Sequence, residues 1–208
     1  MASAMKILEQ RDTNPVITIS RERGSGGRTI AYLLAKKLKS PWRVFHKDIV
    51  EEITQDTDST DEQNTPLDEQ QIVPIKEQLG RIFGNRIRFI NTHYKHLLHI
   101  LTAIGSQGNA IILGRGAHFL FPHALKIRIV SKVEDRIRSL IKYEHISAKE
   151  AKKQIDESDA ERTIFTKRLF KHNLCNAHHY DLIICTGKDM SVEDATDVII
   201  SLAKKKFK

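Results

Sequence analysis

The sequence has few cysteines and no long apolar segment. Only Cys175 and Cys185 occur among its 208 residues, and their spacing does not match that of a metal site. No apolar run approaches the ~20 residues that a membrane-spanning helix needs, and the first residues lack the apolar core of a signal peptide. These absences exclude a disulfide scaffold. They predict a cytoplasmic protein with reduced thiols and no membrane partner.

Aromatic residues are also scarce, at 6%, and no nucleic-acid recognition motif is visible. The formal net charge is nevertheless +8, which predicts an anionic partner. Part of the excess lies in the lysine-rich residues 204–208, a run typical of a solvated tail. Phosphorylated small molecules explain the remaining arginines as well as nucleic acid does, so we rank nucleic-acid binding last.

Residues 16–30, VITISRERGSGGRTI, combine a β-branched run, a glycine-rich turn and a helical pattern. Such a turn binds phosphate because its backbone N–H groups and the helix N-terminus attract anions. The standard phosphate loop is G-x-x-x-x-G-K-[ST]. Residues 22–29 fit it if Glu22 replaces the first glycine and Arg28 the lysine. Sliding the register by one residue puts Gly27 at the lysine position, and a plain strand-to-helix turn is the other interpretation.

The rest of the chain alternates between short apolar runs and helical patterns, which predicts an α/β fold with a doubly wound parallel sheet. Residues 1–14 are treated as a flexible tail, and the acidic residues 54–71 as a mobile loop. The sequences Ser131…Glu134, Ser147…Glu150 and Ser191…Asp194 resemble capping boxes and predict three helix starts. Strands are expected at 16–20, 42–45, 110–113, 125–130 and 181–185. Helices are expected at 27–39, 73–83, 87–107, 132–144, 148–171 and 192–204, with a short one ending at 53.

Three of the predicted strands end in residues that suit anion binding. The first ends in the glycine loop, the second in His46-Lys47-Asp48 and the third in Gly114-Arg115-Gly116. The carboxyl ends of parallel strands line one crevice, so we expect these segments to meet. A phosphate loop facing a second anion-binding arginine suits transfer of a phosphoryl group between two phosphorylated molecules.

Several ordered blocks of the sequence resemble the cytidylate kinase-like family of P-loop nucleoside monophosphate kinases. The blocks are ITISRERGSGGRTIAYLLAKKL, AIILGRGAHFLFP, KVEDRIRSLIKYEHISAKEAKKQIDESDAER and YDLIICT, and they cover most of residues 16–200. The resemblance implies a three-layer fold with a parallel sheet of about five strands, flanked by helices. It also implies one domain over 15–208, with a monophosphate-binding insertion at about 47–108 and an arginine-bearing lid at about 140–175.

The resemblance further implies site residues. Gly24, Ser25, Gly26, Gly27, Arg28 and Thr29 match the phosphate loop that holds ATP. Arg115 matches the arginine that faces the acceptor, and Arg136 the one that lies against the donor's adenine. Arg162 and Arg168 would arrive with the lid as catalytic groups, while Asp159 and Asp48 would bind substrate. Mg²⁺ would be held by the Thr29 hydroxyl, with Ser25 as the alternative.

Each of these residues also has a structural interpretation. Arg115 could cap a helix carbonyl, Arg136 and Arg138 could be the solvated face of an amphipathic helix, and Asp159 with Arg162 could form a surface pair. The sequence has no lysine in its glycine loop, and Leu140 and Glu157 replace lid arginines of related kinases. From the phosphate-binding strand ends and the family resemblance, we nevertheless expect an ATP- and Mg²⁺-dependent kinase for CMP or dCMP. The alternative is a non-catalytic nucleotide-binding sensor or interaction module.

Overall fold

The computed structural model describes residues 14–46, 77 and 79–208. Its strands are β1 (Val16–Arg21), β2 (Arg43–Phe45), β3 (Ala110–Leu113), β4 (Leu125–Ser131) and β5 (Leu182–Thr186). Its α-helices are α2 (Gly27–Leu38), α5 (Thr92–Gln107), α6 (Ala117–Leu120), α7 (Val133–Glu144), α8 (Ala148–Phe170) and α9 (Val192–Lys206). There are also two 3₁₀ segments, Gly84–Phe89 and Ala177–His179, and residues 77 and 79–83 are helical.

The five strands form one parallel sheet in the order β2-β3-β1-β4-β5. All four residues of β3 are aliphatic and buried, and five of the six residues of β1 are buried, as expected for strands near the centre of a sheet that is covered on both faces. From β1 the chain crosses to β2 on one side, and from β3 it crosses to β4 on the other. A crevice therefore opens at the carboxyl ends of β1 and β3.

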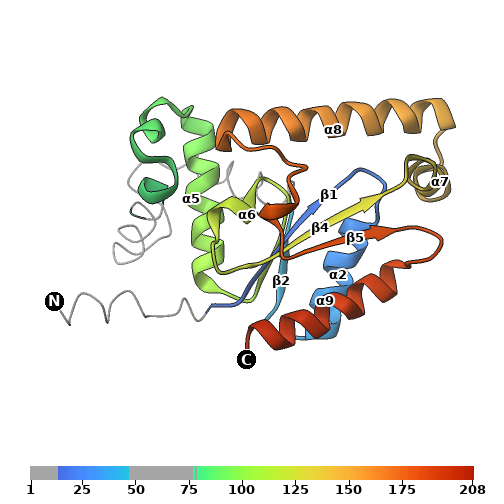
Figure 1. Cartoon of the computed structure of the whole chain (residues 1–208), viewed down its shortest axis with the longest axis horizontal. Coiled ribbons are helices and arrows are strands. Elements are labelled where there is room, and N and C mark those ends of the chain that lie inside the picture. The colour runs from blue at the N-terminus through green and yellow to red at the C-terminus, as the bar shows by residue number, and fades with distance from the viewer. Residues whose placement is uncertain (1–13, 47–76, 78) are drawn as a thin grey trace.

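Helices cover both faces of the sheet, as Figure 1 shows. Alternate residues of β1 divide between the two layers, because successive strand side chains point to opposite faces. Ile17 and Ile19 belong to the core that the sheet forms with α2 and α9. Val16 belongs to the core that contains α5, α6 and the end of α8. The predicted α/β fold with a doubly wound parallel sheet is confirmed.

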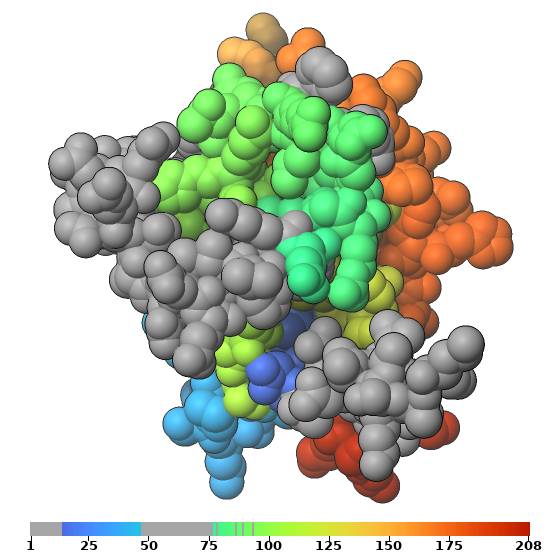
Figure 2. Space-filling model, turned by 90° about the vertical axis from the view of Figure 1, so that its left-hand side faces the viewer, coloured from blue at the N-terminus to red at the C-terminus, as the bar shows by residue number. Residues whose placement is uncertain are grey.

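Two segments pack beside each other on the second of these faces. Figure 2 shows the α5 segment in green next to the segment that begins in α8, in orange. The Tyr94 and Phe165 rings meet edge to face with their centroids 5.7 Å apart, and the Phe83 and Phe170 rings are 5.6 Å apart. These contacts fix the C-terminal half of α8 against α5 and the segment that precedes it. The N-terminal half instead packs on α7 through Leu140, Ala151 and Ile155.

Two details differ from the sequence-based predictions. Residues 87–89 are 3₁₀ and Ile90 is extended, so the helix predicted from 87 begins only at Thr92. Asn91, a residue type that is favoured immediately before a helix, precedes it. Ser131 ends β4 and does not cap α7, because its hydroxyl donates to the Thr186 carbonyl of β5 (2.8 Å). Ser147 and Ser191 do cap α8 and α9.

Some expectations lie outside the described residues. These are Asp48, the short helix ending at 53 and the acidic loop at 54–71. Within the described ranges, no helix combines the length and the apolar composition that crossing a membrane requires.

Candidate functional site

A pocket of about 380 Å³ lies at the carboxyl ends of β1 and β3. Five of its lining residues are arginines, whereas among the described residues Glu161 is the one carboxylate that lines it. The arginines come from five different segments: Arg21 ends β1, Arg23 lies in the glycine loop, Arg28 begins α2, Arg115 follows β3 and Arg162 lies on α8. Carboxylates outside the lining offset two of these charges, Glu144 beside Arg23 and Asp159 beside Arg162. The remaining excess of positive charge suits the pocket to phosphate groups.

The glycine loop connects β1 to α2 beside this pocket. Gly24 (φ 80°) and Gly26 (φ 76°) adopt left-handed conformations that favour glycine. Gly26 is the N-cap of α2, and neither a capping side chain nor an acidic residue compensates the first turn. The starts of α7, α8 and α9 all carry acidic residues. Because helix N-termini attract negative charge, the start of α2 fits a phosphate.

The hydroxyl groups of Ser25 and Thr29, the two candidate magnesium ligands, lie in different environments. The Ser25 hydroxyl is buried, and it donates to the carbonyl oxygens of Glu22 (2.9 Å) and Ile129 (3.4 Å). Thr29 is exposed on the first turn of α2. Thr29 therefore fits a Mg²⁺ ion that completes its shell with phosphate oxygens and water, and Ser25 is a structural residue of the loop. No cluster of three or more metal-binding side chains occurs within the described part of the chain.

Arg115 has a backbone conformation that is unusual for its residue type. Its φ is 54°, and its neighbours Gly114 (φ 81°) and Gly116 (φ 69°) are also left-handed. Left-handed arginine is strained, and such strain is often found at binding sites. The turn directs the side chain into the pocket, where its guanidinium carbon lies 5.8 Å from the centre of the Phe165 ring. This cation–π contact places a charge opposite α8.

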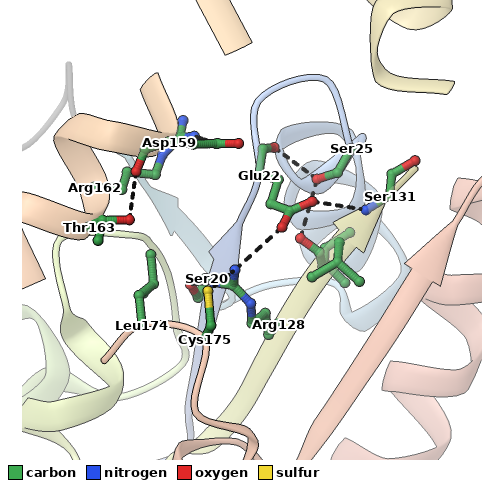
Figure 3. A network of polar contacts seen from close by, with 12 residues as sticks. Ser20, Glu22, Ser25, Arg128, Ser131, Asp159, Arg162, Thr163, Leu174 and Cys175 are labelled. Carbon is green, nitrogen blue, oxygen red and sulfur yellow. Dashed lines mark hydrogen bonds and ion pairs between the residues drawn. The ribbon is translucent and has the colours of Figure 1, made fainter. Parts of the chain in front are cut away.

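A chain of alternating charges links the glycine loop to α8, and Figure 3 shows both of its ends. The Glu22 carboxylate accepts a hydrogen bond from the backbone N–H of Ser131 (3.1 Å) and pairs with Arg136 (3.6 Å). Arg136 donates to the Arg23 carbonyl oxygen and to the Asp159 carboxylate, both at 2.6 Å. Asp159 in turn accepts from Arg162 (3.3 Å).

Burial affects the last member of this chain. Burial lowers the pKa of the Arg162 guanidinium, and the nearby charges of Arg136 and Arg23 lower this pKa further. The carboxylate of Asp159 acts in the opposite direction and raises it. Arginine still stays charged, so the effect is an energetic cost of holding the cation in the pocket. Asp159 reduces that cost. The geometry makes Arg162 a pocket arginine and Asp159 the carboxylate that holds it.

The predicted site residues divide into two groups. Arg28, Arg115 and Arg162 line the pocket, whereas the loop residues 24–27 and Thr29 are not among its lining residues. Arg136 is only 4% exposed and is enclosed between the loop and α8, and Asp159 also lies outside the lining. Arg168 is exposed on the last turn of α8 and does not reach the pocket.

Arg21 and Arg23 were missed as site residues. A signal for Arg21 was available, because residues 17, 19 and 21 share one face of β1, the face toward α2. Arg23 had no comparable signal. Its side chain donates to Glu144 (2.5 Å) and Gln154 (2.9 Å), two residues more than 120 positions away.

One uncharged imidazole also lines the pocket. His118 is 3% exposed, and its ring lies 4.0 Å from that of Phe119 and 4.9 Å from that of Tyr180. Burial, with the charges of His179 and Lys126, lowers the pKa of His118 to about 3. The side chain is therefore neutral at physiological pH and adds no charge to the pocket.

A second hollow lies on the other side of the glycine loop. It measures about 230 Å³, and its lining includes Lys132, Arg138 and Thr186. The Thr186 hydroxyl donates to the Ser25 carbonyl oxygen (2.8 Å), so the hollow adjoins the loop directly. The loop thus separates two spaces that one extended ligand, or two neighbouring ligands, could occupy.

The parallel sheet and the glycine loop after its first strand define an α/β protein of the P-loop type. A family model described as "Cytidylate kinase-like family" matches residues 16–188, and the chain belongs to this family. An uncharacterized protein from Eubacterium ventriosum shares the fold, with 19% identity, a TM-score of 0.63 and coverage of 92% of this chain and 99% of that one.

A shikimate kinase from Acinetobacter baumannii, solved in complex with shikimate, matches at 13% identity with a TM-score of 0.49. That match covers 93% of this chain and 95% of the shikimate kinase. No curated protein sequence matched the chain.

Proposed function

We propose that the protein is a kinase that transfers the γ-phosphoryl group of ATP to a nucleoside monophosphate, with CMP or dCMP as the acceptor. The observation that carries this proposal is the convergence of five arginines on one pocket beside the glycine loop. Phosphoryl transfer needs positioned reactants and neutralised charge more than it needs covalent chemistry by the protein. Membership of the cytidylate kinase-like family supports the choice of acceptor.

The residues divide the work by position. The loop N–H groups and a pocket arginine beside the loop hold the donor phosphates, and Arg115 holds the phosphate of the acceptor. Arg162, supported by Asp159, stabilises the charge on the transferred group, and α8 limits the access of water. ATP would supply the phosphoryl group, and the Thr29 hydroxyl would help to hold a Mg²⁺ ion that offsets part of the phosphate charge. An acceptor phosphate oxygen forms the new P–O bond as the bond to the ADP oxygen breaks.

The hollow beside Thr186 suits the base of the donor. It adjoins the loop on the side away from the arginine pocket, so a triphosphate along the loop would connect the two. The sequence-based hypothesis placed Arg136 against the adenine. The enclosed position of Arg136 instead supports a role in joining the loop to α8, and Arg138 and Lys132 line the hollow.

A coupled assay with ATP, Mg²⁺ and each nucleoside monophosphate in turn tests the proposal. Turnover on CMP or dCMP, reduced at least a hundredfold by Arg115→Ala, is the expected result. Arg43→Ala is the control, because this exposed arginine begins β2, at the amino ends of the strands and away from the pocket. Failure of the wild-type protein to phosphorylate any pyrimidine monophosphate would refute the proposal. ATP-dependent stabilisation without turnover would instead support a nucleotide-binding module.

A further inference from the structure

The glycine loop lacks the lysine that a phosphate loop normally provides, and the structure suggests its replacement. We infer that Arg21, the last residue of β1, supplies the missing cation to the donor phosphates. In the register that makes Gly26 the last glycine of the motif, Gly27 stands at the lysine position and Arg21 at the first glycine. Compared with the motif, a cation stands at the glycine position and a glycine stands at the cation position.

The register itself is supported by the backbone. Gly26 is left-handed and caps α2, and the helix begins at Gly27. Gly27 therefore occupies the first position after the turn, where the lysine of a phosphate loop stands. Arg28, the candidate cation of the other register, is exposed, and its Nη2 atom lies 3.4 Å from His46 at the end of β2.

Gly27 has no backbone reason to be glycine. It is helical, and its φ does not lie in the left-handed region. Glycine in a helix costs about 1 kcal/mol relative to alanine, so its presence needs another explanation. A Cβ atom at position 27 would lie 2.6 Å from Cβ and 3.0 Å from Cγ of Arg21. The root of a side chain cannot move away cheaply, so Gly27 leaves the space that Arg21 fills.

The other end of the Arg21 side chain reaches the pocket. Its Nη1 atom lies 2.0 Å from where a Cβ atom of Gly114 would be. Gly114 follows β3 and lines the pocket together with Arg21 and Arg115. The side chain therefore passes over the start of α2 and delivers its guanidinium between the glycine loop and the Arg115 turn. A cation at this place can contact donor phosphates held by the loop.

The inference depends on the proposed function, and ATP affinity measured by calorimetry keeps the two distinguishable. Arg21→Ala is expected to weaken ATP binding at least tenfold, whereas Arg21→Lys, which keeps the charge, should stay within about threefold of the wild type. The control Arg43→Ala should bind ATP normally. Thermal unfolding without nucleotide shows whether each variant is folded.

The sharpest test moves the cation to the standard place. Gly27→Lys alone should lose ATP binding, because its Cβ atom meets Arg21. The double variant Arg21→Gly/Gly27→Lys should recover at least tenfold in affinity over Gly27→Lys. Relief of the clash alone is measured with Arg21→Gly/Gly27→Ala, which should bind ATP at least tenfold more weakly than Arg21→Gly/Gly27→Lys if the moved cation is what restores binding.

The possible results distinguish failure of the Arg21 inference from failure of the kinase proposal. If Arg21→Ala binds ATP within twofold of the wild type while Arg28→Ala does not, Arg28 is the cation and the inference fails, with the kinase proposal intact. If the wild type binds ATP with the expected variant pattern but transfers no phosphoryl group, the inference stands and the kinase proposal fails. If the folded wild type does not bind ATP, both fail.

Discussion

His118 shows how burial of one side chain sets its charge. Its pKa is lowered to about 3 by burial and by the charges of His179, Lys126, Arg128 and His172. Above pH 6.5 the imidazole is neutral whether the chain is folded or unfolded, so it does not affect stability. Below pH 6.5 the unfolded chain binds a proton that the folded protein excludes, and the free energy of unfolding falls as the pH falls toward 3.

His118→Gln is therefore expected to make the protein less sensitive to acid. Between pH 7.5 and 5.0 the wild type should lose ~2 kcal/mol more of its free energy of unfolding than the variant, at about 1.4 kcal/mol per pH unit. Urea unfolding at the two pH values measures the difference. His123→Gln replaces an exposed histidine and should keep the wild-type dependence. Equal losses in the wild type and His118→Gln would contradict the assignment.

Asp159 and Arg162 should act as a coupled pair in catalysis. Each single change to alanine is expected to lower kcat, and the double change should cost less than the two single effects together, because both remove the same positioned cation. The control is the exposed pair Lys152 and Asp156 on the same helix. That pair should leave kcat and KM unchanged. Additive effects at Asp159 and Arg162 would show that Asp159 does not act through Arg162.

The orientation of α8 decides which of its side chains reach the pocket. The lining residues on this helix recur every three or four positions, as one helical face requires: Ser158, Glu161, Arg162, Phe165 and Thr166. Arg168 comes after these residues, on the last turn of the helix, where it is exposed and does not line the pocket. Rings from other segments oppose rotation of the helix about its axis: Tyr94 contacts Phe165, and Phe83 and Phe119 contact Phe170.

Arg168→Ala is consequently expected to keep turnover within about twofold of the wild type, while Arg162→Ala reduces kcat by about a hundredfold. Steady-state kinetics on one acceptor compares them directly. A large loss in Arg168→Ala would mean that the bound state turns this part of the helix toward the substrates, as the family resemblance predicted.

The N-terminal cap of α9 leads to a prediction about the stability of the protein. Ser191 and Asp194 form a reciprocal capping box at the start of α9, which packs against α2 beneath the sheet. Ser191→Ala should lower the free energy of unfolding by ~1 kcal/mol, because an N–H group of the first turn loses its acceptor. Chemical denaturation measures the loss. Asp194→Asn, which keeps a hydrogen-bonding side chain at this position, should cost less than half as much.

For the whole molecule, nucleotide binding should appear as added stability. ATP at a hundred times its dissociation constant would contribute ~2.7 kcal/mol, which for a domain of this size raises Tm by roughly 5–10 °C. Thermal unfolding with ATP and Mg²⁺ measures this shift, and it should shrink at high salt because the pocket is cationic. An equal shift with short DNA duplexes would favour nucleic acid as the partner instead.

Much of the fold could be predicted because it depends on local patterns. The strands at 110–113 and 125–130 and the helix starts at Ser147 and Ser191 follow from runs of apolar residues and from caps that each span a few positions. Ser131 shows where such reasoning stops. Its cap-like spacing was outweighed by a hydrogen bond to Thr186, a residue 55 positions away on a neighbouring strand.

The site divides in the same way. The sequence determined by itself that a glycine loop follows the first strand and that an arginine follows the third, since both are local motifs. Only the tertiary structure decided which cations share the pocket, because parallel strands join residues such as Arg21 and Gly114 that lie far apart in the chain. It also enclosed Arg136 and left Arg168 on the surface. The physical reason is that strand order and helix rotation, which arise from packing of the whole core, set the direction of each side chain.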